Sequence, residues 1–143
     1  MSLNDSINHV AKTVSDLDQA MKFFGPMLKL LGYTVGTPSA YKEHRLTVSL
    51  NQANGIAFNI WEAERPHAFE VCEPRLHHIA FNVTPRSRVD RAAQLVRDLG
   101  GEIVDGPSEF PFTHCGYYTV YFLGPDRIKF EIVYMPELER DRG

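Results

Sequence analysis

Cysteine, net charge and long apolar runs are all scarce in this sequence of 143 residues. Cys72 and Cys115 are too few for a disulfide framework, so we expect a protein of the reducing cytoplasm. The formal net charge is only −3 and the basic residues are scattered, which argues against a nucleic-acid partner. No apolar stretch approaches membrane-spanning length, and the first residues lack the apolar core of a signal peptide. We therefore expect no membrane association.

What the sequence does contain is typical of a globular protein. Hydrophobic residues make up 43% and charged residues 23%, which are ordinary values for a chain that buries a core. The length is that of about one domain, so we expect residues 1–143 to form a single domain.

An internal repeat relates the two halves of the chain. The segment NHVAKTVS (8–15) aligns with HHIAFNVT (77–84) at a shift of 69 positions, which pairs His9 with His78. Each half then shows the same succession of signals: an alternating strand, an amphipathic helix that ends at a glycine, and further strands. The repeat therefore predicts that both halves have the same local architecture.

Periodicity predicts a β-α-β-β-β order in each half, in modules at about 6–62 and 76–135. In the first half we expect a strand at 7–14, a helix at 17–31, a strand at 33–35 and hairpin strands at 45–51 and 55–61. In the second half we expect a strand at 76–83, a helix at 86–99, a strand at 102–104 and hairpin strands at 117–123 and 128–134. Pro26 predicts a kink or a break near Phe24–Gly25 in the first helix.

Two adjacent histidines, His77 and His78, open the first strand of the second half. Neighbours on a strand point to opposite faces, so the two rings are not expected to share a role. The repeat pairs His78 with His9, and small or polar residues follow each of these two on its own face: Ala11 and Thr13, Ala80 and Asn82. We therefore expect His78 to face inward and His77 to lie near a surface or helix contact.

The last strands of the halves also align, with FNIW (58–61) over FEIV (130–133), so that Asn59 corresponds to Glu131. A carboxylate in an apolar strand is costly unless it is paired or bound to a cation. Taken singly, a strand histidine is more often hydrogen-bonded in a core, and a strand glutamate more often faces solvent. Repeated on equivalent strands, two imidazoles and a carboxylate suit a divalent metal with open positions.

The motifs INHVAKTVSDLD, HHIAF and FEIV, together with the βαβββ repeats, resemble the glyoxalase/bleomycin-resistance/dioxygenase family, also called vicinal oxygen chelate proteins. The resemblance implies an α+β fold in which two βαβββ repeats form an incomplete mixed-sheet barrel around a divalent metal such as Zn, Ni, Mn or Fe(II). It implies His9, His78 and Glu131 as metal ligands, with Asn59 as a weaker fourth candidate. It also implies a homodimer.

The sequence departs from the family pattern in two places. Glyoxalase I enzymes usually have a carboxylate where this chain has Asn59, so the fourth position falls to an amide oxygen or to water. This difference argues against true glyoxalase I activity. The second departure is GPDRIKFE (124–131), where the family often has DPDGNxxE, so that Arg127 replaces a turn glycine.

Aromatic residues supply the candidates for substrate binding. Tyr121 lies ten residues before Glu131, across the last hairpin, and is a candidate for a substrate hydrogen bond or proton transfer. Six further residues are candidates for lining a substrate pocket: Trp61, Phe110, Phe112, His114, Tyr117 and Tyr118. Aromatic strand residues more often pack a core, which is the simpler reading of this group.

The resemblance implies a lyase or isomerase that acts on a small oxygenated substrate, with Glu131 as both ligand and base. One alternative is a ring-cleaving Fe(II) dioxygenase, although those enzymes usually have four modules. The other is a non-enzymatic protein that binds a small molecule such as a drug. Such members generally lose the metal ligands, whereas His9, His78 and Glu131 are present here.

Overall fold

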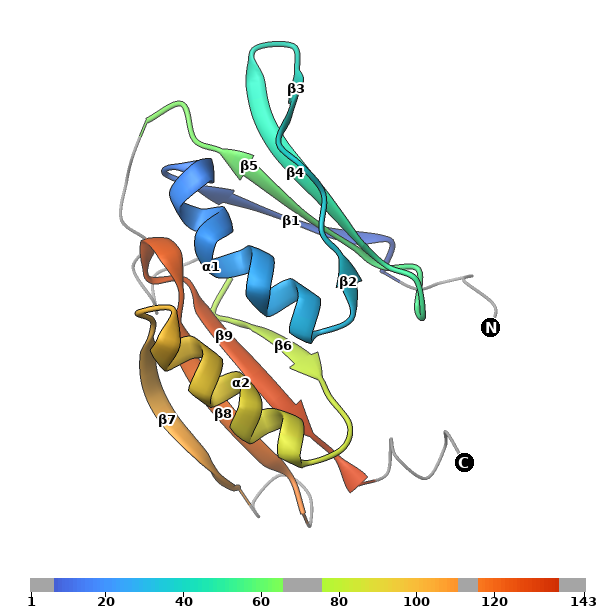
Figure 1. Ribbon diagram of the computed structural model, residues 1–143, viewed down its shortest axis with the longest axis vertical. Coiled ribbons are helices and arrows are strands. Elements are labelled where there is room, and N and C mark those ends of the chain that lie inside the picture. The colour runs from blue at the N-terminus through green and yellow to red at the C-terminus, as the bar shows by residue number, and fades with distance from the viewer. Residues whose placement is uncertain (1–6, 66–75, 111–115, 137–143) are drawn as a thin grey trace. The chain divides into compact units, whose positions relative to one another are not determined.

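The computed structural model describes residues 7–65, 76–110 and 116–136. The chain divides into two compact units, residues 1–68 and residues 69–143. In the described residues each unit has one α-helix and one sheet, drawn in Figure 1. In the described part of the chain, no helix has both the length and the apolar character needed to cross a membrane.

The first unit has a mixed sheet with one helix. Its elements are β1 (His9–Val14), α1 (Leu17–Leu30), β2 (Tyr33–Thr34), β3 (Ser39–Tyr41), β4 (His44–Asn51) and β5 (Ala57–Glu62). The strand order is β1-β5-β4-β2, and β3 also pairs with β4. The first and last strands, β1 and β5, are parallel neighbours, while the other pairs are antiparallel.

The second unit repeats this plan. Its elements are β6 (Ile79–Asn82), α2 (Ser87–Asp98), β7 (Glu102–Glu109), β8 (Tyr118–Leu123), the 3-10 turn η1 (Pro125–Arg127) and β9 (Lys129–Tyr134). The strand order is β6-β9-β8-β7, with β6 and β9 parallel. As in the first unit, the last strand therefore lies between the first strand and the rest of the sheet.

The strand registers of the two units are equivalent. Asn59 pairs with Ala11, and Glu131 pairs with Ala80. Ala11 and Ala80 are 69 positions apart, whereas Asn59 and Glu131 are 72 apart, so the register pairs the last two although the second unit has three more residues in between. The alignment of the segment FNIW over the segment FEIV is thus confirmed by backbone register.

Two glycines lie close to neighbouring strands, at positions one residue apart in the repeat. A Cβ on Gly36 would lie 2.1 Å from the carbonyl oxygen of Val48, and a Cβ on Gly106 would lie 2.4 Å from that of Thr119. Near these contacts β2 and β3 separate in the first unit, and the pairing of β7 shifts register in the second. The strand β3, which the sequence did not predict, is therefore the counterpart of the distal part of β7.

The helix α1 continues through Pro26, so of the kink or break expected near Phe24–Gly25 the break does not occur. Asp16 caps its start by accepting a hydrogen bond from the Gln19 amide at 2.8 Å. Proline removes the hydrogen bond to the Lys22 carbonyl, but Pro26 and Lys22 are both exposed, so water can replace the lost donor. The opposite face of the helix is buried and holds it together, through Leu17, Ala20, Phe23, Phe24, Met27 and Leu28.

The helix α2 covers one face of the second sheet, where it contacts β7, β8 and β9 (Figure 1). Its buried residues are Val89, Ala92, Ala93 and Val96. The hydroxyl of Tyr118 on β8 donates to Asp90 on α2 at 2.6 Å, so the even-numbered residues of β8 face the helix. The odd-numbered residues consequently lie on the opposite face of the sheet, together with Glu131, which pairs with Tyr121.

Candidate metal-binding site

Glu131 lies at the centre of the candidate site in the second unit. It belongs to β9, and only 2% of its surface is exposed. Phe130 and Ile132 on either side are also buried. An ionised carboxylate at such a position requires hydrogen-bond donors or a cation, because burial removes the water that would otherwise solvate it.

The two oxygen atoms of the Glu131 carboxylate have different neighbours. Oε1 accepts hydrogen bonds from the Tyr117 hydroxyl at 2.5 Å and from the Thr119 hydroxyl at 2.9 Å. Oε2 lies 3.1 Å from Nε2 of His78. The carboxylate is therefore fixed by hydroxyl groups on one oxygen and presents the other oxygen to an imidazole.

Strand geometry explains why these hydroxyls converge on Glu131. Tyr117, Thr119 and Tyr121 are two residues apart, so they share the face of β8 that carries no helix. Tyr117 directly precedes β8, and its carbonyl accepts a hydrogen bond from the Phe110 amide at 3.0 Å, which continues the pairing with β7. The aromatic ring of Tyr117 is long enough to reach back along the sheet to Glu131.

The two tyrosines of this cluster are held in their protonated forms. Burial, reinforced by the hydrogen bond to Glu131, raises the pKa of Tyr117 well above its ordinary value. Burial and the negative charge of Glu131 raise the pKa of Tyr121 to about 12. Both hydroxyls therefore act as hydrogen-bond donors near neutral pH.

His78 lies between Glu131 and a second histidine. Its ring meets the Tyr121 ring edge-on, with centroids 5.7 Å apart. Its Nδ1 atom lies 2.8 Å from Nδ1 of His77. His77 is exposed, as expected for a residue near the surface, but its ring contacts that of His78 and does not point away from it. Strand alternation does not apply to this pair, because β6 begins only at Ile79 instead of residue 76.

In the first unit, the expected ligands lie on the adjacent strands β1 and β5. His9 is exposed at the start of β1, with its Nδ1 atom 2.8 Å from Oδ1 of Asn8. Asn59 lies on β5, two register positions from the partner of His9. Its Oδ1 atom is buried, and among the described residues it has no hydrogen-bond partner. A buried oxygen without a donor is costly, and a cation is one group that can satisfy it.

The donor set is chemically suited to a divalent cation, although it is divided, with two candidate donors in each unit. Imidazole nitrogen together with carboxylate and amide oxygen suits Zn, Mn, Fe and Ni. Across residues 7–65, 76–110 and 116–136, no three or more His, Cys, Asp or Glu side chains gather closely enough to hold a metal ion. In the second unit the fit rests on the His78–Glu131 pair, and in the first unit it rests on the unsatisfied oxygen of Asn59.

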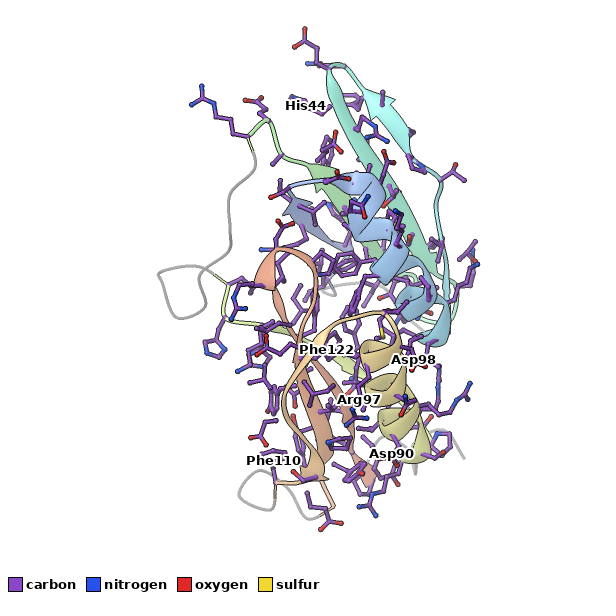
Figure 2. All side chains as sticks on the ribbon, turned by 60° about the vertical axis from the view of Figure 1, so that its left-hand side comes forward. His44, Asp90, Arg97, Asp98, Phe110 and Phe122 are labelled. Carbon is purple, nitrogen blue, oxygen red and sulfur yellow. The ribbon has the colours of Figure 1, made fainter. Side chains whose placement is uncertain are left out.

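The other expected site residues have separate surroundings. Tyr118 does not join the Glu131 cluster, because it lies on the opposite face of β8, with its hydroxyl on Asp90 (labelled in Figure 2) and Arg86 4.0 Å from its ring centre. Trp61 meets the His44 ring edge-on, with centroids 6.4 Å apart. Phe112 and His114 lie outside the described residues.

The sequence named Tyr117 only as an aromatic candidate near the substrate and gave no role to Thr119, and neither was predicted to contact Glu131. The signal was available, since counting back from Tyr121 in steps of two along the strand leads to both positions. These hydroxyls do not define a site by themselves. Their contribution lies in the contact with Glu131.

This chain belongs to the Glyoxalase/Bleomycin resistance protein/Dioxygenase superfamily, whose model matches residues 6–132. A curated relative is the uncharacterized protein YqjT of Bacillus subtilis strain 168. It is 28% identical over 132 residues, a match that covers 89% of this chain and 97% of that protein.

Solved structures show the same fold. One is a glyoxylase/bleomycin resistance protein/dioxygenase domain from Frankia sp. EAN1pec, with a TM-score of 0.74 and 19% identity over 91% of this chain and 97% of that chain. Another is a mutant of the fosfomycin resistance protein FosX from Listeria monocytogenes, with a TM-score of 0.63 and 19% identity over 96% of this chain and 98% of that chain. The predicted α+β fold with βαβββ repeats is thereby confirmed.

Proposed function

We propose that this protein is a divalent-metal-dependent lyase or isomerase that acts on a small oxygenated substrate. The observation that carries the proposal is the contact between Nε2 of His78 and Oε2 of the buried Glu131, 3.1 Å apart. These are the atoms with which histidine and glutamate bind metals. The superfamily includes metal-dependent proteins, since the structure of the FosX mutant contains Mn(II) and 1S,2S-dihydroxypropylphosphonic acid.

The proposed ligands are His9, His78 and Glu131, with Asn59 as a weaker fourth candidate. The equivalence of the two units supports this set, because each unit offers a histidine at its first strand and an oxygen donor on its last strand. The bound cation would be Zn, Ni, Mn or Fe(II). A homodimer and a cytoplasmic location stay predictions.

A divalent ion held by these residues would polarise neighbouring oxygen atoms of a substrate and stabilise negative charge that develops on them. Tyr121 lies on the same face as Glu131 and keeps its proton near neutral pH, so we assign it the role of donating a hydrogen bond to substrate oxygen. Glu131 is a candidate ligand and a candidate base. The hydroxyls of Tyr117 and Thr119 hold Oε1 of the carboxylate in place and leave Oε2 facing His78, which favours the ligand role.

Substrate contacts outside this cluster are proposed for Trp61, Phe112, His114 and Tyr118. Trp61 has the apolar surface to bind a carbon skeleton, and its edge contact with His44 fixes the ring. Tyr118 is the weakest of the four because its hydroxyl is already committed to Asp90. The experiment that tests the overall proposal is measurement of metal content, followed by a substrate screen of the metal-loaded protein.

Loss of the hydroxyls that hold Glu131 should weaken metal binding. Tyr117→Phe and Thr119→Val are each expected to lower the affinity for Zn(II) by about tenfold, the usual effect of removing a partner of a metal ligand. Thr119→Ser keeps the hydroxyl and serves as the matched control, with affinity close to that of the wild type. Competition with a chromophoric chelator measures the affinities of the wild type and the three variants. Equal affinity in all variants would show that these hydroxyls do not support the ligand.

Because residue 59 is an amide, we expect the activity of this protein to differ from that of glyoxalase I. Because Asn59 supplies no charge and no base, we expect weak or absent turnover of the hemithioacetal formed by methylglyoxal and glutathione. Asn59→Glu is expected to tighten metal binding by about tenfold or more, since a unit charge at contact range contributes roughly 1–4 kcal/mol. Asn59→Gln is the neutral control. Robust hemithioacetal turnover by the wild type would make glyoxalase I the better assignment, and unchanged affinity in Asn59→Glu would remove residue 59 from the ligand set.

A further inference from the structure

Each proposed ligand histidine is hydrogen-bonded at Nδ1 by the residue directly before it in the chain. Nδ1 of His9 lies 2.8 Å from Oδ1 of Asn8, and Nδ1 of His78 lies 2.8 Å from Nδ1 of His77. The repeat shift of 69 positions that pairs His9 with His78 also pairs Asn8 with His77. Two chemically different residues thus make the same contact at equivalent places in the two units.

The chemistry of Asn8 decides where the proton of His9 resides. An amide oxygen only accepts hydrogen bonds, so Nδ1 of His9 must carry the proton that joins them. In a neutral imidazole, a proton on Nδ1 leaves a lone pair on Nε2. Asn8 therefore selects the form of His9 that can bind a cation through Nε2.

His77 makes the corresponding hydrogen bond to His78, but unlike Asn8 it can either donate or accept the proton. An imidazole nitrogen can donate or accept, so the His77–His78 contact permits either ring to supply the proton. When Nδ1 of His78 donates to His77, Nε2 of His78 carries a lone pair toward the position of Oε2 of Glu131. When His77 donates instead, Nε2 of His78 is protonated and donates to Glu131, which satisfies the buried carboxylate without a cation.

We propose that Asn8 and His77 are equivalent positioning residues, which fix the rings of His9 and His78 so that Nε2 is the metal-binding atom. The inference rests on the proposed function, because it assigns a purpose to these contacts only if the two histidines bind a metal. Histidine ligands usually donate their second nitrogen to a neighbouring acceptor, and loss of that acceptor lowers metal affinity by about 10- to 100-fold. The same range is expected here for Asn8→Ala and His77→Ala.

The repeat supplies a sharp rescue test. His77→Asn places in the second unit the residue that the first unit uses, and Asn8→His does the converse. Both exchanges should bind Zn(II) within about threefold of the wild type, whereas both alanine variants should bind at least about tenfold more weakly. Leu76→Ala, which changes the exposed neighbour of His77, is the control for disturbance of the local backbone. Zn(II) affinities are measured by chelator competition.

A second measurement reads the hydrogen bonds without metal. Long-range proton–nitrogen correlation spectra of the metal-free protein distinguish the two neutral forms of each histidine. We expect His9 in the form protonated at Nδ1 in the wild type, and a mixture of forms after Asn8→Ala. His44 provides the internal reference, because Asn8→Ala does not alter the surroundings of its ring.

The outcomes separate the inference from the proposed function. Rescue by the exchanges together with loss in the alanine variants supports the inference. If the wild type binds Zn(II) and His78→Ala does not, but Asn8→Ala and His77→Ala bind as tightly as the wild type, the inference is overturned and the proposed function stands. If the wild type itself takes up no Zn(II), Ni(II), Mn(II) or Fe(II), both are overturned.

Discussion

Replacing His9 and His78 together by alanine is expected to abolish metal binding, while the wild type takes up about one divalent ion per chain. The double variant removes both imidazole donors of the proposed set and leaves only Glu131 and Asn59. Two oxygen donors from different strands do not hold a transition-metal ion tightly at micromolar concentration. Elemental analysis after loading with Zn, Ni, Mn or Fe(II) and removal of excess metal measures the stoichiometry.

A matched control for this experiment is His44→Ala, which removes an imidazole that contacts Trp61 and lies outside the proposed ligand set. Its metal content should equal that of the wild type. The single variants should each retain only part of the affinity, because either histidine alone leaves a three-donor set incomplete. Equal metal content in the wild type and in the double variant would reject the proposed site.

The repeat made much of the fold predictable from sequence. A period of two in the strands and of 3.6 in the helices identified both helices and the main hairpins, and the pairing of Asn59 with Glu131 followed from aligning the last strands. The helix is not broken at Pro26, because tertiary packing of one helix face outweighs the loss of one exposed hydrogen bond. The strand β3 was missed because its three residues are all exposed and show no alternation of apolar and polar character.

The candidate site was predictable where its residues lie within a strand ladder. Glu131 and Tyr121 are register partners on β9 and β8, and simple counting places them on one face. Counting failed for His77 and His78, because this pair precedes the first residue of β6 and is free of the alternation that a ladder imposes. Hydrogen bonds between neighbouring side chains outside regular structure leave no periodic signal, which is why the roles of Asn8 and His77 emerged only from the structure.

The glycine at position 106 should be the position most sensitive to addition of a single methyl group. Its φ is +79°, and an added Cβ would lie 2.4 Å from the carbonyl oxygen of Thr119. We expect Gly106→Ala to lower the free energy of unfolding by about 2–4 kcal/mol, because the positive φ alone costs roughly 1–2 kcal/mol and the backbone of β8 must also shift. Urea unfolding followed by circular dichroism measures the change.

Alanine substitutions at two other glycines serve as comparisons, since each adds the same methyl group in different surroundings. Gly36→Ala should also destabilise the protein, because its Cβ would lie 2.1 Å from the Val48 carbonyl oxygen. Gly25→Ala lies in α1, where an added Cβ meets no atom beyond its chain neighbours, and it should change stability by no more than about 1 kcal/mol, because the gain over glycine is offset by the restriction that Pro26 places on the residue before it. In Gly106→Ala, displacement of Thr119 also removes a hydrogen-bond donor from Glu131, so we expect the metal affinity of this variant to fall together with its stability. Gly36→Ala leaves the Thr119–Glu131 hydrogen bond in place, so we expect no loss of metal affinity from that cause. Full stability in Gly106→Ala would mean that β7 does not approach β8 as closely as this register requires.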